Sequence, residues 1–142
     1  MTEVRIMTPL SSEVFFYGLF MDPAVLETKG ISCPGSRPGI LRDWAIRIGR
    51  RATLVPDPGQ SVHGVLMSLP LPELDRLYEE ASVQMYRPVA VMVEAEAAAA
   101  PALTYVLPEP PAPDERNPEY ATKLRALAER LGFPEAYTRS IV

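Results

Sequence analysis

Hydrophobic and polar residues alternate in several short stretches of this 142-residue chain, separated by proline and glycine. The first such stretch, residues 14–17, is β-branched or aromatic throughout, which favours a pleated and half-buried strand. Gly18 interrupts it. Asp22 followed by Pro23 is typical of a helix start, and Gly30 marks the end of that helix. The pattern therefore predicts a strand, a glycine turn and a helix in direct succession.

Further strands are predicted by the same alternation. They are expected at residues 39–48, 50–55, 62–67, 86–94 and 103–107. The segment Pro56-Asp57-Pro58-Gly59 has strong turn chemistry, so residues 50–67 are predicted to form a hairpin. Further helices are expected at residues 70–78, from Pro118 to Gly132 and from Pro134 onward. Asn117 followed by Pro118 repeats the cap-then-proline pattern of a helix start. The segments at residues 1–12, 31–38 and 108–118 are expected to be a loose lead-in, a loop and an extended proline-rich connection.

The length suits one compact domain over residues 1–142. With 47% hydrophobic residues, 23% charged residues and a net charge of -4, the composition is globular and argues against nucleic acid as the main partner. Cys33 is the only cysteine, which excludes an internal disulfide and fits a reducing compartment. No stretch has the apolar length of a signal peptide or membrane span, so a cytoplasmic protein is expected. The oligomeric state stays open, and a homodimer is one alternative.

The strand, glycine turn and helix start bring several main-chain N–H groups to one open end, where they can attract a carboxylate or a phosphate. The candidate anion-binding loop consists of Tyr17, Gly18, Leu19, Phe20 and Met21. An alternative stays open, in which Tyr17 and Phe20 are core aromatic residues and Gly18 only allows the chain to bend.

Glu79 and Glu80 follow the helix predicted at residues 70–78, at a junction from which side chains can be aimed into a cleft. The chain has no Ser/His/Asp set, phosphate loop or dinucleotide fingerprint. His63 is the only histidine, so no metal site is assigned. A glutamate whose pKa is raised by burial can move protons near neutral pH if the nucleophile belongs to the substrate. Alternatively, both acids are ordinary residues at a helix end.

Several short motifs follow one another in an order that covers residues 14–137. They are Phe16-Tyr17-Gly18-x-x-Met21, Ala52-Thr53-Leu54, Pro58-Gly59, Val62-x-Gly64-Val65-Leu66, Leu74-Asp75, Glu79-Glu80, Tyr86-Arg87, Tyr105, Pro110-Pro111, Tyr120 and Pro134-x-x-Tyr137. This order resembles the gamma-glutamylcyclotransferase-like family. The resemblance implies an α+β fold, in which a small mixed or antiparallel β-barrel carries peripheral helices.

The resemblance also implies a transferase activity that needs no cofactor. In that family, backbone amides of the Tyr-Gly loop bind the glutamyl carboxylate and one glutamate is the acid/base. The free α-amine of a small γ-glutamyl compound attacks its own γ-carbonyl, and 5-oxoproline and an amine or amino acid leave. The family usually has Ser or Thr after Tyr-Gly; here Leu19 retains only the backbone amide.

The same resemblance indicates which residues would act. The family tends to place its glutamate three residues after the aspartate of Leu-Asp, and here Tyr78 stands three residues after Asp75. Counting back from Tyr86 indicates Glu79 as the acid/base, whereas the helix phase indicates Glu80, which is preferred.

Tyr17, Tyr86 and Tyr137 match the family's aromatic residues around the site, with core packing as the alternative. Arg87 and Arg51 are candidates for orienting a substrate carboxylate, with surface exposure as the alternative. The alternative function is that of a catalytically silent relative, which binds a small carboxylate ligand or a protein partner.

Overall fold

The computed structural model describes residues 10–31, 35–96 and 98–142. Its centre is a closed barrel with the strand order β1-β3-β2-β4-β5. The strands are β1 (Ser11–Phe16), β2 (Arg37–Ile48), β3 (Ala52–Pro70), β4 (Arg87–Glu94) and β5 (Ala99–Val106). Neighbouring strands are antiparallel except β1 and β5, which run parallel and close the ring. The expected small mixed β-barrel is confirmed.

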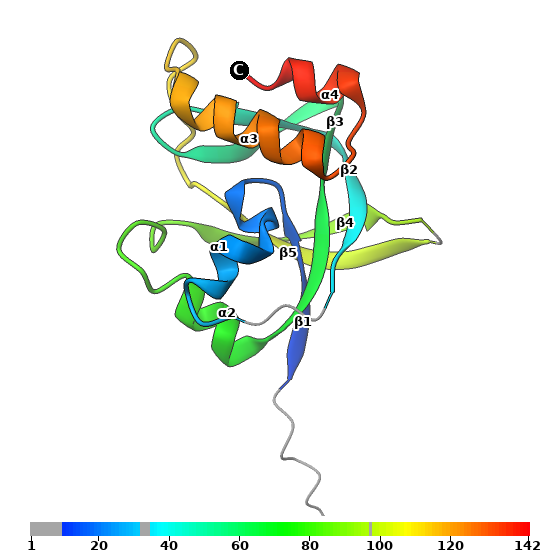
Figure 1. Ribbon diagram of the computed structural model, residues 1–142, viewed down its shortest axis with the longest axis vertical. Helices are drawn as coiled ribbons and strands as arrows, with labels where there is room; N and C mark the ends of the chain where they lie inside the picture. Colours follow the sequence, from blue (N-terminus) through cyan, green and yellow to red (C-terminus); the bar gives the residue numbers. More distant parts are fainter. Residues whose placement is uncertain (1–9, 32–34, 97) are drawn as a thin grey trace, which may run out of the picture.

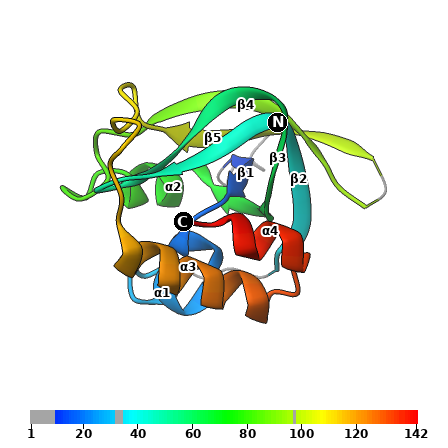
Figure 2. The ribbon, with the colours of Figure 1, turned by 90° about the horizontal axis from the view of Figure 1, so that it is seen from above.

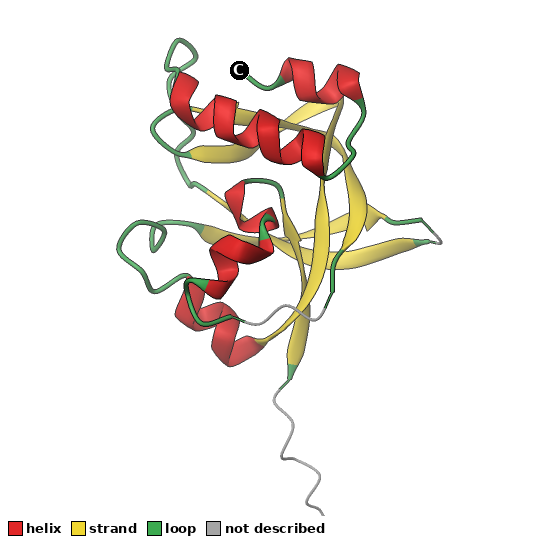
Figure 3. Cartoon of the chain, viewed as in Figure 1, coloured by secondary structure: helices red, strands yellow, loops and turns green. Residues whose placement is uncertain are grey.

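The helices lie outside the barrel, as Figures 1 and 3 show. They are η2 (Leu19–Met21), α1 (Pro23–Glu27), α2 (Leu71–Leu77), α3 (Pro118–Arg130) and α4 (Glu135–Ser140). In the view from above, α1, α3 and α4 gather on one side of the barrel (Figure 2). In the described part of the chain, no helix is long and apolar enough to cross a membrane.

Two helix starts have the caps that the sequence predicts. The Asp22 carboxylate accepts a hydrogen bond from the Ala24 N–H at 3.0 Å, and the Asn117 side chain accepts one from the Tyr120 N–H at 3.2 Å. In each case a proline follows the cap, where its missing N–H removes no hydrogen bond. These caps fix where α1 and α3 begin, and α3 thereby places Tyr120 in its first turn.

The core surrounds β1, because this strand is buried on both of its faces. Val14, Phe15 and Phe16 are 0%, 1% and 3% exposed. Since successive side chains of a strand point in opposite directions, one face fills the barrel and the other is covered from outside. Gly64 of β3 leaves the room that this packing needs, since a Cβ atom there would collide with the Phe15 ring.

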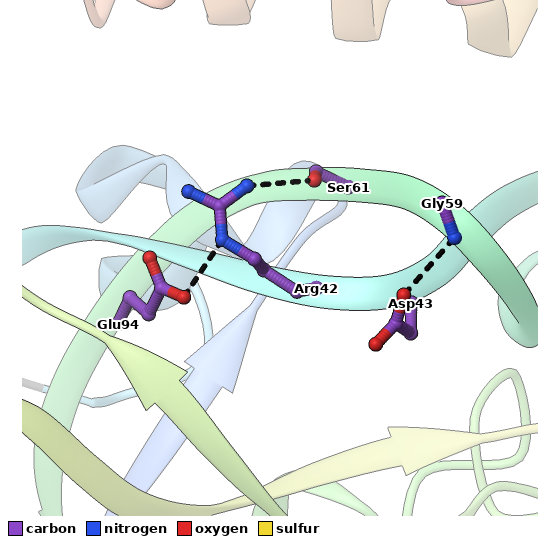
Figure 4. A network of polar contacts seen from close by, with 5 residues as sticks. All are labelled: Arg42, Asp43, Gly59, Ser61 and Glu94. Atoms are coloured by element: carbon purple, nitrogen blue, oxygen red, sulfur yellow. Dashed lines mark hydrogen bonds and ion pairs between the residues drawn. The ribbon is translucent and has the colours of Figure 1, made fainter.

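The hairpin predicted over residues 50–67 is wrong, because β3 runs as one strand from Ala52 to Pro70. Asp43 of β2 has a φ of 68°, and its carboxylate accepts a hydrogen bond from the Gly59 N–H at 3.0 Å (Figure 4). The β2 ladder continues on both sides of this point, so residues 57–60 form a bulge inside β3. The turn-forming residues therefore bend a strand and do not end it.

Other boundaries also differ from the prediction. β1 begins at Ser11, so the end of the expected lead-in belongs to a strand that pairs with β3. β5 begins at Ala99, because it pairs with β4 along its whole length. Residues 1–9 of the lead-in and Cys33 of the expected loop lie outside the described residues.

Candidate functional site

A pocket of about 270 Å³ lies at one end of the barrel. β1 and β5 run parallel, so their carboxyl ends lie at the same edge of the barrel, where the end of β5 meets the start of β4. The loop after α2, which borders this end, lies on the left in Figure 1. Four residues of the predicted anion-binding loop line the pocket, namely Tyr17, Gly18, Leu19 and Phe20.

Five of the chain's six tyrosines line this pocket, and each comes from a different segment. They are Tyr17, Tyr78, Tyr86, Tyr105 and Tyr120. The rings of Tyr78 and Tyr105 stack with their centroids 3.8 Å apart and an interplanar angle of 8°. The Tyr17 hydroxyl donates to the Tyr105 carbonyl at 2.6 Å. The wall of the pocket is therefore aromatic and held by contacts between distant parts of the chain.

These phenols stay protonated at neutral pH. Burial raises the pKa of Tyr17 and of Tyr78 well above the ordinary value, and neighbouring tyrosines act in the same direction. Burial also raises the pKa of Tyr86, while Arg51 acts in the opposite direction. The Tyr17 and Tyr86 hydroxyls already donate to main-chain carbonyls, those of Tyr105 and Ala52, and none of these protonated phenols is suited to accept a proton.

The turn η2 leaves main-chain donors beside the pocket. Its two internal hydrogen bonds are donated by Met21 and the residue after it, at 3.0 and 3.1 Å. The Leu19 N–H donates to the Tyr120 hydroxyl at 3.3 Å. Among the described residues, none accepts a hydrogen bond from the N–H of Gly18 or of Phe20. Two amides of the predicted loop are therefore available to a ligand.

Gly18 is required by space. A Cβ atom at this position would lie 2.6 Å from the Tyr120 hydroxyl. Its φ of -113° is accessible to any residue, so the backbone conformation alone would tolerate a side chain. The close approach of α3 to the Tyr-Gly loop explains why the chain has glycine here.

Arg50 and Arg51, in the turn between β2 and β3, supply positive charge to the pocket lining. The Arg51 Nε donates to the Ser82 carbonyl at 2.9 Å, which fixes the guanidinium beside the loop before β4. Among the described residues, no carboxylate forms an ion pair with either arginine. Both charges are therefore available to an anionic ligand.

Neither Glu79 nor Glu80 is among the residues that line the pocket, and none of the described lining residues is acidic. The Glu80 carboxylate pairs with the Lys29 ammonium at 2.7 Å, and Glu79 is exposed. The path of the chain after α2 explains this, because Leu77 enters the core and Tyr78 takes the adjacent place in the pocket wall. Among the described residues, no group of three or more His, Cys, Asp or Glu side chains could hold a metal.

A profile of the gamma-glutamyl cyclotransferase, AIG2-like family matches residues 14–124. The chain belongs to this family. A solved structure named gamma-glutamyl cyclotransferase is similar over 93% of this chain and 86% of its own, with a TM-score of 0.76 and 20% identity. No sequence among the curated proteins matches the chain.

Two further solved structures share the family fold. One is an uncharacterized human protein, similar over 92% of this chain and 86% of its own, with a TM-score of 0.76 and 20% identity. The other is YkqA from Bacillus subtilis, with a TM-score of 0.77 and 26% identity over 91% of this chain and 52% of its own. The present chain thus spans about half of the length of YkqA.

Three other residues that the family resemblance suggested do not line the pocket. Met21 is a core residue, 1% exposed. Arg87 is exposed and donates to two nearby main-chain carbonyls. Tyr137 packs against His63 with the ring centroids 4.7 Å apart. Their roles in binding stay predictions that the pocket geometry does not favour.

The pocket lining also includes residues that were not among the candidate site residues predicted from the sequence. Tyr105 and Tyr120 belong to the family motifs, and their places at a strand end and in a first helical turn could have indicated the pocket. Tyr78 stands where the resemblance expects the glutamate of the family, and it lines the pocket. Arg50 belongs to an arginine-rich stretch whose orientation depends on how β2 turns into β3, which composition does not reveal.

Proposed function

We propose that this member of the family binds a small compound that carries a carboxylate, in the tyrosine-lined pocket. The observation that supports this is the charge of the lining, where Arg50 and Arg51 have no acidic partner among the described residues. A carboxylate would gain charge-assisted hydrogen bonds there. The amides of Gly18 and Phe20 would add donors, and the tyrosine rings would cover the apolar part of the ligand.

Cyclisation of a γ-glutamyl amide is the second candidate function, and membership of the family favours it. That reaction needs a group that takes a proton from the attacking amine and delivers one to the departing amine. The buried tyrosines are unsuited to this at neutral pH, because burial raises their pKa. Glu80 would have to leave Lys29, or Glu79 would have to turn inward, for either to act.

The binding proposal is tested by isothermal titration of the purified protein with simple carboxylic acids and with γ-glutamyl amino acids and amines. At least one compound is expected to bind, and Arg51→Ala is expected to weaken it by about tenfold, because a hydrogen bond to a charged group is lost. The control is Arg76→Ala, an exposed arginine that also donates to one main-chain carbonyl, of Gly30, at 3.3 Å. Absence of binding, or an Arg51→Ala variant with unchanged affinity, contradicts the proposal.

The second candidate is tested with the same compounds by measuring the release of 5-oxoproline. Under the binding proposal the wild-type protein releases none. If it does release 5-oxoproline, and Glu80→Gln or Glu79→Gln abolishes the release, the protein is a cyclotransferase and the binding proposal is too narrow.

A further inference from the structure

The charge of the pocket restricts the ligand further. Arg51 lies close enough to Tyr86 to influence its pKa, and its Nε is held by the Ser82 carbonyl at 2.9 Å. Tyr86 and Ser82 both line the pocket, so the partly exposed Arg51 places its positive charge beside the pocket. Arg50 is the neighbouring lining residue with a second positive charge.

Three carboxylates lie close to lining residues without lining the pocket themselves. Glu80 pairs with Lys29 at 2.7 Å, and Glu115 accepts a hydrogen bond from the Arg50 N–H. Burial raises the pKa of Tyr105, and the charge of the Asp75 carboxylate raises it further. None of these three acids is among the lining residues. Among the described residues, the pocket lining therefore contains no acidic side chain.

The aromatic wall does not replace that charge. Tyr78 and Tyr105 cover one face of each other, and Tyr86 meets Tyr78 edge-on with the centroids 6.2 Å apart. A cation near ring faces gains a modest attraction, but two unpaired guanidinium groups at the same pocket oppose it. Placing an ammonium group in this pocket would bury a charge without a partner, which is costly.

We infer that the ligand is a short carboxylic acid with an apolar or aromatic tail and without an α-ammonium group. This inference rests on the proposed function and specifies its ligand. The carboxylate pairs with the arginines, and the tail lies against the tyrosine rings. A γ-glutamyl compound has the same carboxylate but also carries an ammonium group, for which the described lining provides no acidic partner.

The test compares two anilides that differ only in this group, glutaric acid monoanilide and γ-glutamylanilide, by isothermal titration against the full chain. The monoanilide is expected to bind at least about tenfold more tightly than γ-glutamylanilide, because the ammonium group of γ-glutamylanilide would have no acidic partner in the pocket. Arg51→Ala should weaken the monoanilide and reduce the preference, whereas Arg76→Ala should change neither affinity.

Equal affinities, or tighter binding of γ-glutamylanilide, overturn the inference and leave the proposed function standing. Binding of neither anilide also overturns the inference, and the wider panel of carboxylates then decides the proposed function separately. A preference for the monoanilide that is unchanged in Arg51→Ala overturns the part assigned to that guanidinium.

Discussion

Tyr78 forms part of the pocket wall at the position where the family resemblance expects a glutamate. Its ring stacks on Tyr105 and meets the Phe20 ring edge-on, with the centroids 6.0 Å apart. No described residue forms a hydrogen bond with its hydroxyl. A side chain at position 78 therefore lies beside the Tyr-Gly loop, and its chemistry decides whether the pocket contains a group that can carry a proton.

At the residue scale, Tyr78→Glu is expected to create cyclotransferase activity. The new carboxylate would supply both a partner for the α-ammonium group and an acid/base, so 5-oxoproline release should exceed the uncatalysed background, measured with the wild type, by on the order of a hundredfold. Release from a γ-glutamyl amide is the measurement. Tyr78→Phe, which keeps the ring without a carboxylate, is the control and should stay inactive. A Tyr78→Glu variant that circular dichroism shows to be folded, but that releases no 5-oxoproline, would contradict this prediction.

At the scale of elements, α4 packs against the barrel through a cluster of rings. His63 of β3 lies 4.7 Å from Tyr137 and 5.8 Å from Phe133, measured between centroids. Burial lowers the pKa of His63 below its ordinary value of 6.5, and Arg42 acts in the same direction. The folded protein therefore keeps this histidine neutral at a pH where the unfolded chain already protonates it.

This contact predicts a loss of stability in acid. At a pH between the lowered pKa of His63 in the folded protein and its ordinary pKa in the unfolded chain, the unfolded chain binds more protons than the folded protein. The free energy of unfolding therefore falls as the pH drops below about 6.5. Urea denaturation at about pH 7.5 and about pH 5 should show a larger loss for the wild type than for His63→Gln. Because His63 is the only histidine, the difference isolates its contribution. Equal losses in both proteins would contradict the prediction.

At the scale of the whole molecule, closure of the barrel assembles the site. The Thr104 hydroxyl of β5 donates to the Phe15 carbonyl of β1 at 3.0 Å, and both residues are buried. Directly after β1, the Tyr17 hydroxyl donates to the carbonyl of Tyr105, near the end of β5. The junction between β1 and β5 therefore joins two walls of the pocket that lie far apart in the sequence.

Removing the Thr104 hydroxyl should weaken this junction. Thr104→Val keeps the shape of the side chain but leaves the Phe15 carbonyl without this donor, so the free energy of unfolding should fall by about 1–3 kcal/mol. Equilibrium urea denaturation gives the value. Thr104→Ser, which keeps the hydroxyl, should lose less. A Val variant as stable as the wild type would show that closure does not depend on this bond.

Features that depend on residues close together in the chain were predictable from the amino-acid sequence. Asp22 and Asn117 cap α1 and α3 as predicted, because a cap and the N–H groups it accepts lie within a few residues. The strand at residues 14–17, the helix after Pro70 and the family with its barrel could likewise be predicted, since alternation and motif order are properties of the chain.

Features that depend on contacts between distant residues became clear only from the folded chain. Residues 57–60 form a bulge and not a turn, because Asp43 of another strand holds Gly59. Glu80 pairs with Lys29, which is 51 positions away in the sequence, and does not line the pocket, whereas Tyr78 lines it with Tyr105. The charge of a pocket depends on which side chains converge from separate segments, and this convergence is set by long-range packing that local pattern does not encode.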